Sequence, residues 1–245
     1  MFRLLFILAL VFLSQNILSQ EKREIYVIVH GAWGGGWSFK TVEKILNENE
    51  SIVYRPTLTG LGERVHLFSK NIGLETHIED VSNMIKYEDI NNIILIGHSY
   101  GGMVITGVAD KLPSRIKKLV YVDAFLPYNE ESVFSITKRK PNKKDLEQGF
   151  IYPFWVSDEK KPPKDEPHPL KTFTDKLILK NPERNKIPTH YILTYEKGLD
   201  PLNDDFALHF ERAKKQGIET YLFESDHNPQ WSAPEEFSKL ILDLK

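Results

Sequence analysis

A serine in a glycine-flanked turn is the residue of this chain that is best placed to do chemistry. The turn reads Gly97-His98-Ser99-Tyr100-Gly101 and follows an apolar run over residues 93–96. An apolar strand that ends in G-x-S-x-G and leads into a helix is typical of a serine nucleophile exposed at a sharp corner. The amide groups of such a helix point back toward the serine. The pattern therefore predicts that Ser99 is a nucleophile and that the Tyr100 N–H binds a developing oxyanion, with an ordinary glycine-rich turn as the alternative.

A serine nucleophile needs a base to remove its proton, so the chain must supply a histidine. His227 lies in Ser225-Asp226-His227-Asn228-Pro229, between the last predicted strand and the final helix. A loop at that place reaches the carboxyl edge of a parallel sheet, and the chain order serine, acid, histidine puts the base there. We predict that His227 is the general base, and the alternative is a loop histidine that caps a turn. Structural interpretations suffice for the other histidines that we weighed, which are His66, His98, His168, His190 and His209.

Two carboxylates at predicted strand ends are candidates for the acid that orients His227. Asp123 follows the strand predicted over residues 118–122, and Glu196 follows the one over residues 190–194. Asp123 lies in an apolar run, where a carboxylate without a partner is costly to bury. Glu196 lies in a more polar context in which the neighbouring Lys197 can pair with it. We therefore prefer Asp123, which would fix the imidazole tautomer and stabilise the imidazolium, while Glu196 stays open and a turn cap is the structural alternative for Asp123.

A glycine-rich segment follows the first predicted strand. It reads His30-Gly31-Ala32-Trp33-Gly34-Gly35-Gly36-Trp37 and matches neither the G-x-G-x-x-G nor the Gly-Lys-Ser/Thr pattern of nucleotide-binding loops. An oxyanion-hole loop fits better, with the Ala32 N–H as the partner of the Tyr100 N–H. Trp33 and Trp37 either wall the pocket or pack in the core. Neither an H-E-x-x-H nor an EF-hand pattern occurs, so we predict no metal and no cofactor.

Composition points to one globular domain. The chain has 245 residues, of which 41% are hydrophobic and 27% charged, and its 32 basic and 34 acidic side chains give a formal net charge of −2. So balanced a charge provides no field that would recruit nucleic acid. Because the chain contains no cysteine, neither a disulfide nor a thiol nucleophile is possible.

The first 20 residues differ from the rest. Arg3 precedes ten apolar residues at positions 4–13, and the small residue Ser19 precedes a charged segment. This is the pattern of a signal peptide, and the apolar run is shorter than the roughly 20 residues that a membrane-spanning helix needs. We predict an exported, periplasmic or secreted, protein that has no membrane contact after cleavage. An uncleaved anchor is the alternative.

Strand and helix patterns alternate from residue 24 to residue 245. Such alternation predicts an α/β domain with a mostly parallel sheet covered by helices. Buried strands are predicted over residues 25–29, 51–54, 93–96, 118–122, 190–194 and 219–223, and helices over residues 38–49, 75–87, 101–111, 204–216 and 234–244. Residues 125–188, rich in Lys, Pro and aromatic residues, break the rhythm. We predict that they form a cap insertion in which the aromatic run at 150–155 packs as a helical lid over the strand ends.

These motifs together resemble the α/β-hydrolase superfamily, and in particular its branch of small esterases that includes plant hydroxynitrile lyases, plant methylesterases and bacterial carboxylesterases. The resemblance rests on Val29-His30-Gly31-Ala32-Trp33, on Gly97-His98-Ser99-Tyr100-Gly101-Gly102 and on Asp226-His227, and it extends through residues 56–64 and 76–81. It implies an eight-stranded, mostly parallel sheet with a helical cap after the sixth strand. Since the first predicted strand resembles the superfamily's third strand or an early edge hairpin, we expect that one or two amino-terminal strands are either missing or unrecognised here.

The sequence also departs from this branch. Plant members usually carry an Asp after the seventh strand, where this chain reads Thr194-Tyr195-Glu196-Lys197, whereas Asp123 occupies the position after the sixth strand that some lipases and lactone hydrolases use. The lyases rely on a lysine near the base, and Asn228-Pro229-Gln230 supplies none. Hydrolysis is therefore favoured over lyase activity.

The sequence thus predicts a serine hydrolase that cleaves a small to medium carboxylic ester through an acyl-enzyme. A lactone or carbon–carbon bond hydrolase on the same triad is one alternative, and a slow-turnover ligand-binding protein of the same fold is another. The partner is a small-molecule ester, for which an aromatic lid favours an apolar or aromatic group. No oligomeric state is predicted.

Overall fold

The computed structural model describes residues 23–157 and 159–244. Their main sheet has six strands in the order β2-β1-β3-β4-β7-β8, and every neighbouring pair is parallel. The strands are β1 (Ile25–Val29), β2 (Ile52–Tyr54), β3 (Ile93–His98), β4 (Ile116–Val122), β7 (Thr189–Tyr195) and β8 (Glu219–Glu224). All six predicted strands are present, within two residues at each end. The predicted signal peptide at 1–20 lies outside the described residues and stays a prediction.

The central strands are apolar on both faces because helices cover both. In β3, Ile93 and Leu95 belong to one hydrophobic cluster, while Ile94 and Ile96 belong to the other. Side chains alternate between the two faces of a strand, so a strand buried on both sides must be apolar at every position. This accounts for the unbroken apolar run before Ser99.

The edge strands are less buried than predicted. In β2, Ile52 is 37% exposed, and in β8, Leu222 is 51% exposed. Each of these strands has a neighbour on one side only. The prediction of six buried strands is therefore wrong for the two edges.

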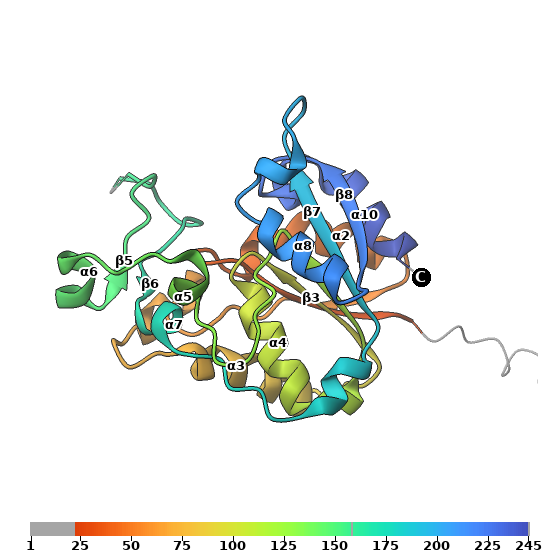
Figure 1. Ribbon diagram of the computed structural model, residues 1–245, viewed down its shortest axis with the longest axis horizontal. Helices are drawn as coiled ribbons and strands as arrows, with labels where there is room; N and C mark the ends of the chain where they lie inside the picture. The colour runs from red at the N-terminus through yellow and green to blue at the C-terminus, as the bar shows by residue number, and fades with distance from the viewer. Residues whose placement is uncertain (1–22, 158, 245) are drawn as a thin grey trace, which may run out of the picture.

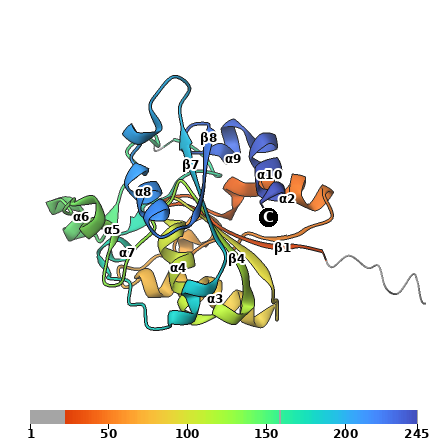
Figure 2. The same cartoon turned by 45° about the vertical axis from the view of Figure 1, so that its right-hand side comes forward.

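Helices pack on both faces of the sheet (Figure 1). The first cluster contains residues from α3 (Leu74–Tyr87), α4 (Gly101–Lys111) and α8 (Ala207–Lys215). The second contains residues from α2 (Lys40–Glu48) and α10 (Pro234–Asp243). Figure 2 shows α3 and α4 below the sheet and α2 and α10 beyond its other face. A 3-10 turn, η1 (Gly36–Phe39), leads into α2 and takes up the first part of the helix predicted from residue 38.

The segment predicted as a cap follows β4 and lies to one side of the sheet (Figure 1). It contains α5 (Val133–Thr137), α6 (Lys143–Gln148), β5 (Phe150–Ile151), β6 (His168–Pro169), α7 (Lys171–Thr174) and the 3-10 turn η4 (Pro182–Lys186). The aromatic run at 150–155 is not the predicted helix, because Phe150 and Ile151 pair with Pro169 and His168 in a two-stranded antiparallel sheet. Pro153, two residues after the end of β5, is compatible with a turn and not with a helix interior.

Among the described residues, the main sheet has six strands and not the eight that the resemblance implies. In this sheet, the cap follows the fourth strand in chain order.

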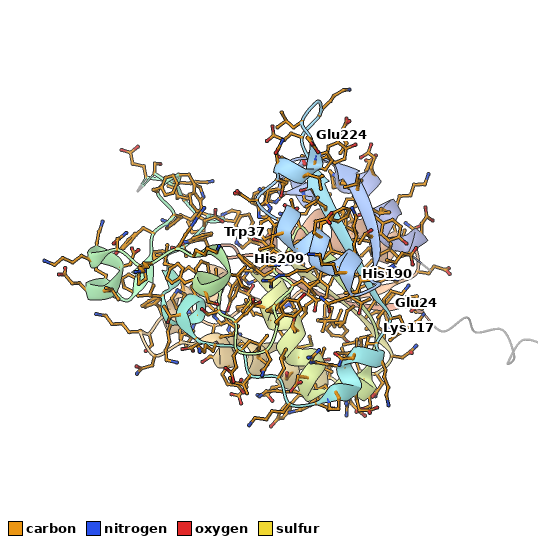
Figure 3. All side chains as sticks on the ribbon, in the orientation of Figure 1. Glu24, Trp37, Lys117, His190, His209 and Glu224 are labelled. Atoms are coloured by element: carbon orange, nitrogen blue, oxygen red, sulfur yellow. The ribbon has the colours of Figure 1, made fainter. Side chains whose placement is uncertain are left out.

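The carboxyl and amino ends of the strands lie at opposite edges of the sheet. Glu24 and Lys117 form an ion pair at the amino edge, next to the first residues of β1 and β4. Trp37, in η1 after β1, lies near the middle of the molecule (Figure 3). The candidates Ser99, Asp123 and His227 all lie at the carboxyl edge of the sheet, because each follows the end of a parallel strand.

Candidate active site

Ser99 occupies a strained turn between β3 and α4. Its φ is 54°, in the left-handed region that non-glycine residues rarely enter. The Ser99 N–H donates to the Val122 carbonyl over 3.2 Å, and the Ser99 carbonyl accepts from the Phe125 N–H over 3.1 Å. The turn is thus tied on both sides to the end of β4. Strain of this kind persists only where the surroundings over-determine it and is common at active sites.

Asp123 and His227 are in direct contact. His227 Nδ1 lies 2.5 Å from Asp123 Oδ2, and the Thr194 N–H donates to Asp123 Oδ1 over 3.2 Å. Asp123 is fully buried and also has a left-handed φ, of 44°. With Nδ1–H donating to the carboxylate, His227 Nε2 is the nitrogen free to accept a proton. Of the two acids weighed from the sequence, the structure brings Asp123 to His227.

Glu196 lies elsewhere. It follows the last residue of β7, and its side chain is exposed. The next residue, Lys197, pairs with Glu224 of β8 over 3.9 Å. A solvated carboxylate at the rim of the sheet needs no partner in the interior.

Two residues that sequence reasoning did not select hold the His227 imidazole from other sides. The Phe206 ring stacks on it, with centroids 5.1 Å apart and an interplanar angle of 7°. His98 Nε2 lies 2.7 Å from the His227 carbonyl oxygen, to which it donates. His98 thus supports the loop of the base instead of taking part in proton transfer. No local pattern identifies Phe206, which comes from the irregular segment before α8.

The two predicted oxyanion donors are free. Among the described residues, neither the Ala32 N–H nor the Tyr100 N–H has a hydrogen-bond partner. The loop that carries Ala32 is pinned by His30, whose Nδ1–H donates to the Gly31 carbonyl over 2.7 Å and whose Nε2 accepts from the Leu58 N–H over 3.1 Å. Both amides are thus available to a ligand.

Ser99, Ala32 and His227 line one cavity of about 370 Å³. All four tryptophans of the chain line it too, and they come from three separate segments: Trp33 and Trp37 from the glycine-rich segment, Trp155 from the cap and Trp231 from α9 (Pro229–Ser232). Trp37 and Trp231 stack at 5.7 Å, and Trp33 meets Trp155 edge to face at 4.9 Å. Flat aromatic surface thus forms part of the cavity wall. Trp33 and Trp37 both line the pocket, and Trp33 also packs against the first hydrophobic cluster.

The cap adds charged groups to this cavity. Lys160 and Asp165 both line it, and Asp165 Oδ2 accepts from the Trp155 indole N–H over 2.8 Å. Sequence reasoning selected neither residue, because both lie in a Pro- and Lys-rich stretch that looks like an ordinary solvated loop.

Buried histidines surround the site as neutral hydrogen-bonding groups. Burial lowers the pKa of His30 and of His77 to about 4, and the pKa of His98 to about 3, where the neighbouring His227 adds to the effect. His77 Nε2–H donates to the Thr59 carbonyl over 3.0 Å, and its Nδ1 accepts from the Tyr100 hydroxyl over 3.0 Å. The loops next to the cavity are thus joined by imidazoles that stay uncharged at neutral pH.

Within the described residues, no group of three or more metal-ligating side chains comes together. In the same part of the chain, no helix is long and apolar enough to cross a bilayer.

Comparison with known sequences gives the class of the protein. The pattern of the alpha/beta hydrolase family matches residues 26–240. The chain therefore belongs to the alpha/beta hydrolase family.

Its relatives include esterases. The chain is 49% identical over 111 residues to a carbendazim hydrolyzing esterase of Nocardioides sp. (strain SG-4G). The aligned region covers 45% of this chain and 46% of that protein. It is 31% identical over 130 residues to methylesterase 2 of Arabidopsis thaliana, covering 47% of this chain and 45% of that protein. An alpha-hydroxynitrile lyase of Arabidopsis thaliana is 32% identical over 119 residues, 44% of this chain and 42% of the lyase. The aligned part of the chain spans about half the length of each of these curated relatives.

Solved structures show the same fold. An extracellular alpha/beta-hydrolase from a Paenibacillus species, described as sharing structural and functional homology with tobacco salicylic acid binding protein 2, superposes with a TM-score of 0.72. The two chains are 24% identical, and the match covers 89% of this chain and 98% of the other. At this identity the likeness shows the fold alone.

The buried imidazoles make a prediction about stability. Because the pKa of His77 is about 4 in the folded chain and 6.5 when exposed, the unfolded chain binds more protons between these values. The free energy of unfolding therefore rises with pH across this window, by up to about 1.4 kcal/mol per pH unit for each such histidine. We expect His77→Gln to flatten the dependence by about one proton in urea unfolding at pH 4.5–6.5. An unchanged slope in His77→Gln would contradict the buried neutral imidazole.

The contact between Asp123 and His227 makes a prediction about Ser99. Asp123→Asn removes the charge that holds the imidazole tautomer, a change that costs about 10⁴-fold in rate in a comparable triad. We expect the rate at which a fluorophosphonate probe labels Ser99 to fall by a similar factor. Glu196→Gln is the matched control and should label like the parent chain. The reverse outcome, with slow labelling only in Glu196→Gln, would show that Glu196 is the acid.

Proposed function

We propose that the chain is a serine esterase that cleaves small to medium carboxylic esters through an acyl-enzyme. The observation that carries the proposal is the buried Asp123 carboxylate 2.5 Å from His227 Nδ1, with His227 lining the same cavity as Ser99. A base oriented by a carboxylate, beside a serine in a strained turn, is what nucleophilic catalysis by serine needs.

The first half of the reaction forms the acyl-enzyme. Ser99 Oγ attacks the ester carbon while its proton passes to His227 Nε2, and the carbonyl oxygen becomes an oxyanion. The Ala32 and Tyr100 N–H groups bind that oxyanion, each contributing about 3 kcal/mol of transition-state stabilisation. His227 then gives its proton to the leaving alkoxy oxygen, and the carbon–oxygen bond breaks. Asp123 stays ionised and stabilises the imidazolium throughout.

The second half releases the acid. His227 Nε2 takes a proton from a water molecule, whose oxygen attacks the acyl carbon. The tetrahedral intermediate collapses as the proton returns to Ser99 Oγ, and the free carboxylic acid leaves. The same two amides bind the second oxyanion, because the same carbon reacts in both halves.

We further propose that the preferred esters carry a flat aromatic ring in the acyl or alcohol part. Four tryptophans wall a cavity of about 370 Å³ next to Ser99, and aromatic pairs gain about 0.5–1.5 kcal/mol beyond the burial of area. Relatives that are called a carbendazim hydrolyzing esterase and a methylesterase support an ester substrate of small size. The lactone, carbon–carbon bond and slow-turnover alternatives gain no specific support from the site.

Replacement of the nucleophile tests the esterase proposal. Ser99→Ala should lower the turnover of p-nitrophenyl acetate and butyrate by at least about a thousandfold, since loss of the nucleophile of a serine triad removes most of the catalysis. Turnover is followed as release of p-nitrophenol, and the fold of the variant is checked by its melting temperature. Equal rates in Ser99→Ala and in the parent chain would exclude the proposal.

A change in the aromatic wall tests the substrate class. Trp155→Ala should lower kcat/KM for methyl benzoate about tenfold relative to methyl butyrate, because one aromatic contact is lost only by the first ester. The ratio of the two esters cancels any effect on the catalytic residues that both share. Tyr87→Ala is the matched control, because its ring is 91% exposed and does not line the cavity. An unchanged ratio in Trp155→Ala would argue against an aromatic preference.

A further inference from the structure

The oxyanion loop contains a strained turn centred on Trp33. The Gly34 N–H donates to the Ala32 carbonyl over 2.7 Å, and Trp33 between them has a φ of 63°. A turn closed by a bond between residues two apart, with positive φ at its centre, is the rarer and more strained form of the γ-turn. A non-glycine residue keeps this conformation only where its surroundings impose it.

Every hydrogen-bonding group of Trp33 is bonded to the cap. The Trp33 N–H donates to His168 Nδ1 over 3.1 Å, and the indole N–H donates to the Ile151 carbonyl over 2.9 Å. The Trp33 carbonyl accepts from the Glu166 N–H over 2.9 Å. Ile151 and His168 are register partners in the hairpin of β5 and β6. The hairpin thus presents two acceptors side by side to the two N–H groups of one residue.

His168 is built into this contact. It is fully buried, and its ring lies 4.9 Å from the rings of Tyr100 and Phe173. Its Nε2 has no hydrogen-bond partner among the described residues, so Nδ1 makes the one polar contact of the imidazole. Burial, with His77 and His30 nearby, holds the pKa of His168 well below its usual value. The ring therefore stays neutral and can accept at Nδ1, which a charged imidazole could not do.

We propose that the cap hairpin, through the His168 imidazole, holds the Ala32–Gly34 turn in the conformation that presents the Ala32 N–H to the oxyanion. His168 is then a positioning residue that acts through Trp33 and touches no reacting atom. The inference rests on the esterase reaction proposed above. It makes the cap a part of the oxyanion hole as well as a wall of the cavity.

The test compares three side chains at position 168. Asn places its amide oxygen where Nδ1 lies and restores the acceptor, Gln carries its acceptor one bond farther out, and Leu has none. We expect His168→Leu and His168→Gln to lower kcat for p-nitrophenyl butyrate by about 10- to 100-fold, below the 10²–10³ lost with a whole oxyanion donor. KM should change little, because the donor acts on the transition state. His168→Asn should recover most of the lost kcat.

Equal kcat values in His168→Asn and His168→Leu, in variants that melt cooperatively, would overturn the proposal. A loss confined to KM would do the same, since it would mean that the cap only shapes the cavity. If His168→Leu does not fold, His168→Gln takes its place, because it also removes the acceptor from the position of Nδ1 and keeps a polar side chain. An unchanged kcat in His168→Gln would then overturn the proposal.

Ser99→Ala separates this outcome from failure of the esterase proposal. Ester turnover that does not depend on Ser99 would contradict the esterase proposal itself. Turnover that depends on Ser99 but does not change with the residue at position 168 would contradict only the positioning role of His168.

Discussion

The pairing of β3 with β4 is the constraint on which the rest of the site depends. Their parallel register brings both strand ends to the same edge of the sheet, where Ser99 follows one strand and Asp123 follows the other. Hydrogen bonds from Ser99 to Val122 and from Phe125 to Ser99 then join the two turns directly. Both residues have a positive φ, so two strained turns brace each other. The cost of about 1–3 kcal/mol for each is offset by the buried sheet behind them.

Uncharged imidazoles stabilise the loops around the turns of Ser99 and Asp123. His30, His77 and His98 are buried and each hydrogen-bonds a backbone carbonyl. A histidine can donate from one nitrogen and accept at the other, which lets it satisfy two loops at once without bringing a charge into the interior. His227 differs from them because a carboxylate lies on its Nδ1 side and the cavity lies beside it. The same type of side chain thus joins loops in one environment and is the candidate base in another.

The cap contributes more than a cover. Its hairpin bonds the oxyanion loop through Trp33, and its Trp155 completes the aromatic wall of the cavity. The cavity is therefore lined by residues of the cap as well as by residues of the loops that follow the main strands.

Local patterns in the sequence predicted the strands of the main sheet, the helices on its two faces, and Ser99, His227 and the glycine-rich loop as candidates. Each of these depends on neighbours in the chain: apolar alternation sets the strands, and glycine spacing sets the turns. The apolar context favoured Asp123 over Glu196, but only the tertiary structure shows which of the two meets His227, because that contact joins residues 104 positions apart. Three other features also depend on contacts between distant segments. They are the hairpin in place of the expected helical lid, the stacking of Phe206 on His227 and the four tryptophans around one cavity. They arise where distant segments converge, and no periodicity within a segment encodes that convergence.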